Sequence, residues 1–417
     1  MASPSSRRGP APGRLPIWRV PGMPALTAMT FVGFAGYAVL LPVAPLWAVH
    51  GGADAAGAGL VNGILLLFTV LTQLFVPPAL RRFGWGPVLT AGMVLLGLPA
   101  VLYAVSDHLV PVLTLSAVRG IGFGVLTVTG SAAVAQLVDP HRRGEAIGAY
   151  GLAIALPNLV LLPLGPWIAQ HAGFWVIFVV SGLPLLGVPP ALRLARVIHG
   201  EVADVLHPEQ GGDAGAGKRV APAGTEPERT AYRRLLPPMV LLLSVTLAGG
   251  AVITFVPQMV GSALVTTLGL FVMGLVTAVT RWRAGIVADR HGAGRFLWPL
   301  VLVTAVGMAL TAWSVTDLEQ TRLVPFFAGM VVVGIAYGAL QNLTLVVSFN
   351  AVSRPHHNLA SAVWNIGFDA GTGLGSVAVG ALAVQSSFTT GLLVAGAVSV
   401  VVLPVAVLHR RSGDHPR

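Results

Sequence analysis

Blocks of about 20 apolar residues recur along the whole chain, and no other feature limits the possible fold as strongly. A helix of about 20 residues is about 30 Å long, which is the thickness of the hydrocarbon core of a bilayer. Only 10% of the residues are charged, whereas soluble domains carry about 25%. The 51 glycines and 31 prolines are tolerated where membrane helices pack together. The chain is therefore predicted to be an all-α membrane protein.

The apolar blocks predict twelve membrane-spanning helices. We place them at 24–48, 57–79, 87–106, 109–136, 145–169, 173–195, 235–258, 262–281, 296–315, 323–349, 359–384 and 388–408. The first block is longer than the apolar region of a signal peptide, which has about 7–15 residues. We therefore expect it to be retained as the first span.

Basic residues fall almost entirely on one side of this predicted topology. All lysines and arginines except Arg119 and Arg322 lie in the two terminal segments, or in or within three residues of the connections that follow even-numbered spans. Such an excess marks the cytoplasmic side. The sequence thus predicts a multi-pass protein of the cell inner (cytoplasmic) membrane with both termini cytoplasmic. The net charge of +10 lies in loops between apolar blocks, so we expect the lipid bilayer as a partner and no nucleic acid.

The predicted spans divide the chain into two halves joined by a polar segment. Residues 1–22 form an N-terminal tail, 23–196 a first six-helix bundle, 197–234 a cytoplasmic linker, 235–408 a second six-helix bundle, and 409–417 a C-terminal tail. The core of the linker, residues 199–230, is rich in Gly, Ala, Pro and charged residues and has no apolar periodicity, which is typical of a flexible segment. A regulatory role for this segment is the alternative. We expect the protein to be a monomer.

The two halves repeat each other in sequence. Gly120-Ile-Gly-Phe-Gly124 in the fourth span corresponds to Gly334-Ile-Ala-Tyr-Gly338 in the tenth, and residues 144–150 correspond to 358–364 at the same offset. Arg82-Phe-Gly84 after the second span is echoed by Arg290-His-Gly292 after the eighth. Internal repeats of this kind occur in transporters, where the substrate site lies near the midplane between the repeats. The expected fold is two pseudo-symmetric six-helix bundles.

The connection after the eighth span carries a recognisable loop motif. Its sequence, from Gly285 through Asp289-Arg290-His-Gly292 to Arg295, resembles the conserved loop of the major facilitator superfamily, Gly-x-x-x-Asp-Arg-x-Gly followed by basic residues. In that family the loop latches helix ends on the cytoplasmic side through charge pairs. The first-half copy keeps Arg82 and the following glycine but lacks the aspartate. The resemblance therefore implies a latch built from Asp289 and Arg290, with Arg82 in the first half.

Two further segments are similar to this family. Arg119-Gly-Ile-Gly-Phe-Gly124 resembles its fourth-helix signature, and Asn365 followed by Asp369 and three alternating glycines resembles the eleventh helix of efflux members. The antiporter signature of the fifth helix retains only Gly165. The resemblance covers residues 24–408. It implies the fold of the family, with twelve helices, and an activity like that of its drug or metabolite efflux members.

Two charged residues lie about ten positions inside predicted spans, Arg119 in the fourth and Asp369 in the eleventh. A charge exposed to lipid at the bilayer centre costs about 2.5–3.5 kcal/mol or more, so both side chains should face the protein interior. We interpret Asp369 as a proton carrier and Arg119 as a residue that modulates the proton or substrate site. The alternative is a purely structural role for both. The candidates for proton coupling and gating are Arg119, Asp369, Asp289, Arg290 and Arg82.

Uncharged polar and aromatic residues within the spans could line a substrate cavity. The candidates are Tyr37, Asn62, Gln73, Asn158, Gln258, Tyr337, Gln341, Trp364 and Asn365. For each of them, a helix–helix hydrogen bond or packing contact is the competing interpretation.

Several other kinds of site are not predicted. His356 and His357 lie at a helix start, where a solvated position is expected rather than a metal site. The sequence has no phosphate-binding loop with Lys and Ser/Thr and no catalytic triad. We expect no cofactor, no metal and no enzymatic activity.

The sequence thus favours a secondary transporter, a proton-coupled exporter of small amphipathic or apolar molecules such as drugs or secondary metabolites. Few fixed charges inside the spans suit such cargo. The alternative within this class is a sugar or small-metabolite facilitator or symporter. The alternative of another class is a membrane sensor or scaffold without transport, which would lose its activity if residues 200–230 were deleted.

Overall fold

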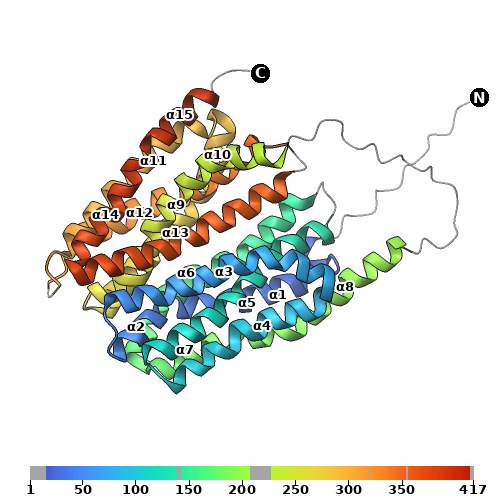
Figure 1. The fold of residues 1–417 in the computed structure, drawn as a ribbon, viewed down its shortest axis with the longest axis horizontal. Coiled ribbons are helices and arrows are strands. Elements are labelled where there is room, and N and C mark those ends of the chain that lie inside the picture. Colours follow the sequence, from blue (N-terminus) through green and yellow to red (C-terminus); the bar gives the residue numbers. More distant parts are fainter. Residues whose placement is uncertain (1–15, 139–141, 207–226, 319, 354–355, 414–417) are drawn as a thin grey trace, which may run out of the picture.

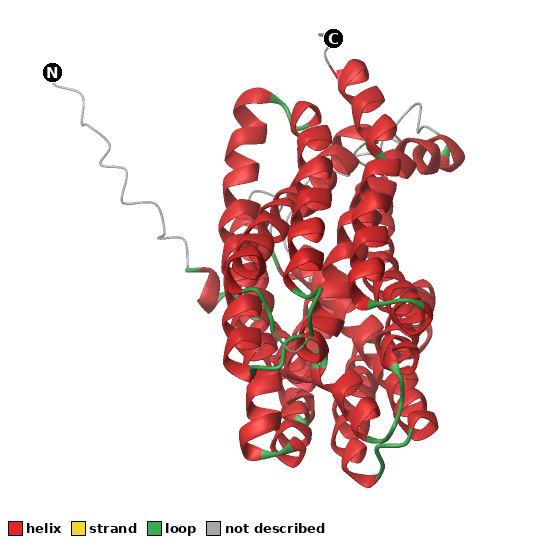
Figure 2. Cartoon of the chain, turned by 90° about the vertical axis from the view of Figure 1, so that its left-hand side faces the viewer, coloured by secondary structure: helices red, strands yellow, loops and turns green. Residues whose placement is uncertain are grey.

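The structure, a computed structural model, describes residues 16–138, 142–206, 227–318, 320–353 and 356–413. These ranges contain helices and no strand (Figure 2). Twelve of the helical segments are long and apolar enough to cross a membrane. Most of their bounds lie within a few residues of the predicted spans. The exceptions are the start of the seventh span, at Glu228 instead of 235, and the end of the eighth, at Ala288 instead of 281. The predicted all-α fold with twelve spans is confirmed.

The first half carries six spans, some of them divided into shorter helices. Its elements are η1 (Ile17–Arg19), α1 (Met23–Leu40), α2 (Val43–His50), α3 (Ala55–Phe83), α4 (Trp85–Leu102), η2 (Tyr103–Val105), α5 (Leu109–Leu137), α6 (Arg143–Ala172), α7 (Phe174–Ser181), η4 (Leu183–Gly187) and α8 (Val188–Leu206).

The second half carries the other six spans. Its elements are α9 (Glu228–Met259), α10 (Ala263–His291), α11 (Gly294–Ser314), α12 (Leu323–Ala351), α13 (His357–Gln385), α14 (Phe388–Val401) and α15 (Leu403–Gly413). In Figure 1 these elements form the upper part of the molecule and α1–α8 the lower part.

Helix occupies both ends of the range predicted to be a linker. Helix α8 continues to Leu206 and α9 begins at Glu228, whereas the prediction placed the linker at 197–234. The added segment of α8, residues 197–206, contains Glu201, Ala203 and Leu206, whose residue types favour helix. Residues 207–226 lie outside the described residues.

Short connections make successive spans run in opposite directions, so the bundle has two ends. We call the end where α1 begins at Met23 end A, and the end where α2 finishes at His50 end B. The connections at end A include Gly84, between α3 and α4, and Gly292, between α10 and α11. Both glycines have positive φ angles, 78° and 79°, which a glycine adopts without strain. The sequence echo between these two loops therefore corresponds to the same backbone turn.

Three spans are interrupted, although the apolar blocks predicted continuous helices. The first breaks at Leu41-Pro42, between α1 and α2, and the sixth passes through η4, which contains Pro184. The twelfth breaks at Val402. At the first break the Leu41 carbonyl oxygen accepts a hydrogen bond from Nδ2 of Asn62 on α3, 3.1 Å away. A neighbouring side chain therefore binds a backbone group at the interruption, as membrane interiors require.

The two halves meet along two helix pairs, α3 with α13 and α6 with α10. Helices α3 and α13 come close because small residues face each other. A Cβ atom at Gly59 would collide with the backbone carbonyl oxygen of Ser376, and one at Gly63 would collide with Val377. Close packing at glycine is the usual way for membrane helices to associate. Both contacts lie in the half of the span nearer end B, so the two halves touch along this helix pair at that end.

Candidate functional site

A buried carboxyl group lies at the contact between the two halves. Asp369, on α13, is 5% exposed, and its Oδ2 accepts a hydrogen bond of 2.6 Å from Nε2 of Gln73 on α3. The same Nε2 lies 3.3 Å from Oγ1 of Thr127 on α5. Among the described residues Asp369 is the one buried carboxylate. It therefore joins the two halves at about mid-span, 12 residues into a 29-residue helix.

The carbonyl oxygen of the same glutamine has no partner. Oε1 of Gln73 is buried and makes no hydrogen bond within the described part of the chain. The amide thus uses its donor on Asp369 and leaves its acceptor free. An unsatisfied buried acceptor carries a free-energy penalty of about 1–3 kcal/mol. A hydroxyl donor placed here would remove that penalty.

Aromatic side chains from both halves lie near this pair. Tyr37, on α1, stacks on Phe123 of α5 with ring centroids 3.8 Å apart and an interplanar angle of 2°. Tyr37 lies within electrostatic range of Asp369 and of Tyr337 on α12. Tyr337 and Trp364 both contact Phe368, at 6.3 and 5.6 Å between ring centroids. We call Tyr37, Gln73, Tyr337 and Asp369 the central site.

A second polar contact lies between the central site and end A, within the second half. Arg281, on α10, donates a hydrogen bond of 3.2 Å from a guanidinium nitrogen to Oε1 of Gln341 on α12. Nε2 of Gln341 and Oδ1 of Asn342 are buried without a partner in the described structure. Trp364 donates from Nε1 to Oγ1 of Thr344, 3.2 Å away. A free donor and a free acceptor therefore remain on the end-A side of the central site in the described structure.

A hydrogen-bond chain crosses the halves nearer end B. Nδ2 of Asn62, on α3, donates to Oγ1 of Thr254 on α9 at 3.0 Å, and this hydroxyl lies 2.8 Å from Oγ of Ser376 on α13. Asn62 is 1% exposed. The same Nδ2 also binds the Leu41 carbonyl oxygen at the break in the first span. This side chain thus ties the interrupted first span to both halves.

Arg119 is the most unusual side chain in the first half. It is fully buried on α5, and none of its three guanidinium nitrogens has a hydrogen-bond partner in the described residues. The guanidinium carbon lies 5.7 Å from the centroid of the Tyr103 ring, an arrangement that favours a cation. A buried cation without a hydrogen-bonded counter-ion is energetically costly. Such a group is suited to receive an anion.

The glycines that follow Arg119 have a packing role. A Cβ atom at Gly120 or Gly124 would collide with backbone carbonyl oxygens of α3, and one at Gly122 would collide with the backbone of α4. Helix α5 therefore fits between α3 and α4 through this glycine pattern. The family-like signature Arg119–Gly124 combines a buried charge with the close packing that holds it in place.

Three predicted cavity residues bind only their own helix. Nδ2 of Asn158 donates to the Ile154 carbonyl oxygen, Nε2 of Gln258 to that of Thr254, and Nδ2 of Asn365 to that of Ser361. Each bond joins residues four positions apart along one helix. The structure therefore brings Tyr37, Gln73, Tyr337 and Asp369 together, whereas the hydrogen bonds of these three amides to described residues stay within one helix.

The predicted latch residues lie at end A. Arg82, near the end of α3, stacks over Phe83 with its guanidinium carbon 5.4 Å from the ring centroid, and Arg290 is exposed near the end of α10. The side chain of Asp289 lies outside the described residues. The latch between these residues remains a prediction.

Some residues of the site were not predicted. The predicted eighth span ends at Arg281, but this residue lies inside α10, which continues to His291. Thr127, Thr254 and Ser376 are small hydroxyl residues without a sequence signal of their own. The signal that could have found Arg281 is the continued helical pattern up to Asp289. Within the described residues no group of three or more potential metal ligands occurs.

Comparison with known proteins agrees with this architecture. The sequence model of the Major Facilitator Superfamily matches residues 26–318 and 239–417. A probable 4-methylmuconolactone transporter from Cupriavidus pinatubonensis (strain JMP 134 / LMG 1197) is 24% identical over 139 residues, which cover 31% of this chain. The match spans about a third of that relative, 32% of its length.

Solved structures share the fold over nearly the whole chain. A bacterial homologue of the human lysosomal transporter Spinster, in an inward-facing and unoccupied conformation, superposes with a TM-score of 0.69 at 15% identity, covering 94% of this chain and 96% of that one. A peptide transporter, POT, in complex with sulfate superposes with a TM-score of 0.71 at 14% identity, covering 94% and 95%. The family-model match and the twelve spans together show that the chain belongs to the Major Facilitator Superfamily.

Proposed function

We propose that this chain is a proton-coupled secondary transporter that exports small amphipathic or apolar molecules across the cell membrane. End A faces the cytoplasm in this proposal, because the basic residues gather at that end. The observation that carries the proposal is the hydrogen bond between Asp369 and Gln73 across the two halves. A titratable group at this contact can link its own protonation to the relative position of the halves.

The amide of Gln73 is suited to bind a protonated Asp369. Nε2 already donates to one carboxyl oxygen, and Oε1 is a buried acceptor without a partner in the described residues. A proton on Asp369 would supply the missing donor, so that the acid and the amide form two hydrogen bonds. Protonation also removes the cost of keeping a charge away from water.

The state of Asp369 should therefore control the opening of end B. The protonated acid favours the conformation in which α3 and α13 touch, which is closed at end B. Loss of the proton toward the cytoplasm leaves a carboxylate facing the unpaired Gln73 oxygen, and this weakens the contact between the halves. Cargo bound in the central site can then favour the conformation that opens at end B. This cycle exchanges cargo for protons.

The side chains of the central site suit amphipathic cargo. Tyr37, Phe123, Tyr337 and Phe368 supply aromatic rings, and one carboxyl group supplies the charge near them. Small-molecule sites typically combine aromatic walls with a few polar groups. Sugars would require more converging donors and acceptors, and the amides of Asn158, Gln258 and Asn365 bind their own helices instead.

Transport in liposomes tests the proposal. The purified chain is reconstituted, a pH gradient is imposed, and movement of lipophilic cations, neutral antibiotics and sugars is measured. We expect the gradient to drive the first two classes and not the sugars. Asp369→Asn should remove the effect of the gradient, whereas Glu228→Gln, which removes an exposed carboxylate, should not. A gradient effect that survives Asp369→Asn contradicts coupling through this residue, and selective movement of sugars contradicts the proposed cargo.

A second candidate function is the transport of small organic carboxylates. The unpartnered guanidinium of Arg119 favours an anionic ligand, and the relative described above is named for 4-methylmuconolactone. The same liposomes can be supplied with labelled aromatic and lactone carboxylates. Uptake that is lost in Arg119→Gln and retained in Arg295→Gln, an exposed arginine at end A, would favour this function over export of amphipathic molecules.

A further inference from the structure

Arg281 lies well inside a membrane span and has no counter-ion. It is ten residues before the end of α10 at His291, which is about 15 Å along the helix axis. It forms no ion pair with a described residue. An ionisable side chain at such a depth is costly unless it faces the protein interior or water, and it commonly marks the path of a ligand. The direction and the neighbours of Arg281 therefore decide what it can bind.

Arg281 faces the other half of the molecule. Seven residues earlier, a Cβ atom at Gly274 would lie 3.4 Å from a methyl carbon of Leu159 on α6. Residues seven apart share one face of a helix, so Arg281 points to the same side, about two turns nearer end A. The arginine is nevertheless exposed. The first half therefore does not cover this side chain, and a small molecule between the halves can contact it.

A buried amide binds the guanidinium and keeps a free donor. Gln341, on α12, is 3% exposed, and its Oε1 accepts the 3.2 Å hydrogen bond from Arg281. Nε2 of the same amide has no partner in the described residues. The two amide atoms share one carbon through bonds of about 1.23 and 1.33 Å, so Nε2 lies within about 6 Å of the Arg281 nitrogen. A carboxylate has two oxygen atoms and forms charge-assisted hydrogen bonds of about 2.7–2.9 Å, so it can span these two donors.

Aromatic rings lie next to this pair of donors. Tyr337 is one helical turn before Gln341 on α12, and it lies within electrostatic range of Arg281. The rings of Tyr337 and Trp364 both contact Phe368 on α13. A cation and an amide donor beside aromatic rings are complementary to an aromatic acid, whose ring packs on the rings and whose acidic group meets the donors.

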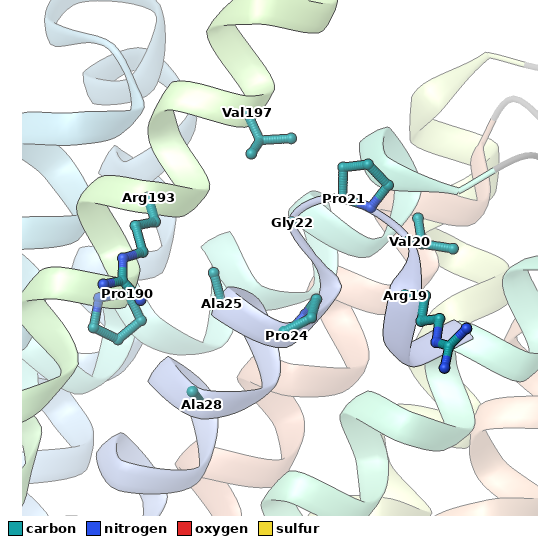
Figure 3. Close-up of a pocket in the computed structure, with 10 residues that line it drawn as sticks. All are labelled: Arg19, Val20, Pro21, Gly22, Pro24, Ala25, Ala28, Pro190, Arg193 and Val197. Atoms are coloured by element: carbon teal, nitrogen blue, oxygen red, sulfur yellow. The ribbon is translucent and has the colours of Figure 1, made fainter. Parts of the chain in front are cut away.

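The arginines at the surface of end A do not converge in this way. Figure 3 shows a groove of about 350 Å³ between the start of the first span and α8, with Arg19 and Arg193 pointing away from each other. Two cations that diverge cannot bind one anion together. Arg281 differs because a second donor lies on the amide to which it is bonded.

We propose that Arg281 and Gln341 form a binding site for the acidic group of a small aromatic acid, whose ring packs against Tyr337 and Phe368. The inference goes beyond the proposed function, because it names a site and a ligand class and depends neither on proton coupling nor on Arg119, which lies in the other half. Binding is measured without transport, so the failure of this inference and the failure of the proposed function are distinguishable.

Isothermal titration calorimetry of the purified full-length chain in detergent tests the site. The probes are 2-naphthoate and 2-naphthamide, which share the same ring and differ in the acidic group. We expect 2-naphthoate to bind more tightly. Arg281→Gln should weaken 2-naphthoate binding about 10- to 100-fold, the usual effect of losing hydrogen bonds to a charged group, and should affect 2-naphthamide far less. Arg283→Gln is the matched control, because this exposed arginine lies two residues away and its guanidinium carbon is 5.7 Å from the Trp282 ring centroid.

A second variant tests the site without removing the arginine. Gln341→Glu places a carboxylate where Arg281 already bonds to Oε1, so an internal ion pair should compete with the ligand and weaken 2-naphthoate binding. Gln258→Glu adds the same charge to α9 near end B and should leave the affinity unchanged.

Three results would overturn the proposal. The first is that 2-naphthoate does not bind, or binds the wild-type chain no more tightly than 2-naphthamide does. The second is that Arg281→Gln binds 2-naphthoate as Arg283→Gln does. The third is that Gln341→Glu binds it as Gln258→Glu does, and this comparison decides the matter if Arg281→Gln binds neither probe.

Discussion

Arg119 and Asp369 are both buried, but their charges are balanced differently. Asp369 accepts a short hydrogen bond from the other half of the molecule, and Arg119 has no hydrogen-bond partner within the described residues. An unpaired buried cation destabilises the fold, because the free-energy cost of its desolvation is larger than the stabilisation from a contact with one aromatic ring. We therefore expect Arg119 to reduce stability in return for a role in ligand binding.

Replacing Arg119 by an apolar side chain of similar length tests this expectation. Arg119→Met should raise the free energy of unfolding by about 1–3 kcal/mol, because it removes an unpaired buried charge. Thermal unfolding in one detergent, followed by tryptophan fluorescence, measures the change. Arg119→Lys keeps the charge and should bring no such gain. A lower unfolding temperature for Arg119→Met would mean that the arginine stabilises the fold.

Asn62 and Asn158 provide a test variant and a matched control for the contact between the halves. Asn62→Ala removes the hydrogen bond to Thr254 on the other half, worth about 1 kcal/mol, and should therefore favour opening at end B. Asn158→Ala removes a bond within one helix and should not. The chain has no cysteine, so spin labels can be attached at His108→Cys and Gln385→Cys, on opposite halves at end B. If the distance distribution between the labels is unchanged in Asn62→Ala, the bond between Asn62 and Thr254 does not help to keep end B closed.

The sequence predicted the two buried charges but not the contacts of the polar residues. Gln73 and Gln258 both occupy apolar spans, and only Gln73 reaches the other half. The difference depends on the rotation of each helix about its axis and on the neighbour that it meets. For Gln73 that neighbour is 296 residues away along the chain. Helical periodicity carries little of this information when nearly every face of a span is apolar.

At the scale of elements, the proposed cycle makes the pairing of α3 with α13 determine how tightly end B closes. The backbone of Gly59 lies against the carbonyl oxygen of Ser376, so a side chain at this position meets a rigid group. Backbone contacts of this kind cannot be relieved by a change of rotamer. Closure at end B therefore depends on the absence of a Cβ atom.

Adding that atom should shift the conformation. Gly59→Ala should destabilise the closed form by about 1–3 kcal/mol, the usual cost of overpacking, and thereby raise the population that is open at end B. The same spin labels measure the shift. Gly148→Ala is the matched control, because a Cβ atom there meets nothing within 4 Å. Equal distance distributions for Gly59→Ala and the control would contradict the assignment of this contact to closure.

The span bounds were predictable, but the breaks in the spans were not. Each span needs about 20 apolar residues to cross the hydrocarbon layer, so the length of an apolar block predicts the length of the span. Proline does not identify the breaks, because Pro77 and Pro78 lie inside the continuous helix α3, whereas Pro42 marks an interruption. Whether a helix tolerates proline depends on which neighbours bind the released carbonyl groups. Asn62 does so at the first break, and that contact is tertiary.

At the scale of the whole molecule, two six-helix halves meet at end B and at mid-span. The hydrogen bonds and closest backbone approaches between the halves, in the described residues, involve α3, α9 and α13 in these two regions. The repeat in the sequence predicted two similar halves, and the structure adds that their contact includes one titratable group. A transport cycle that rocks the halves must break and remake the bond between Asp369 and Gln73.

Proton movement is the most direct test of this account. The chain is reconstituted in liposomes that contain a pH-sensitive dye, and an outward or inward gradient of a transported compound is applied without a pH gradient. We predict that protons move opposite to the compound in the wild-type chain, because the carboxyl of Asp369 binds a proton in one conformation and releases it in the other. Asp369→Asn should abolish proton movement, and Glu228→Gln should preserve it. Proton movement of equal size in Asp369→Asn would contradict the central claim.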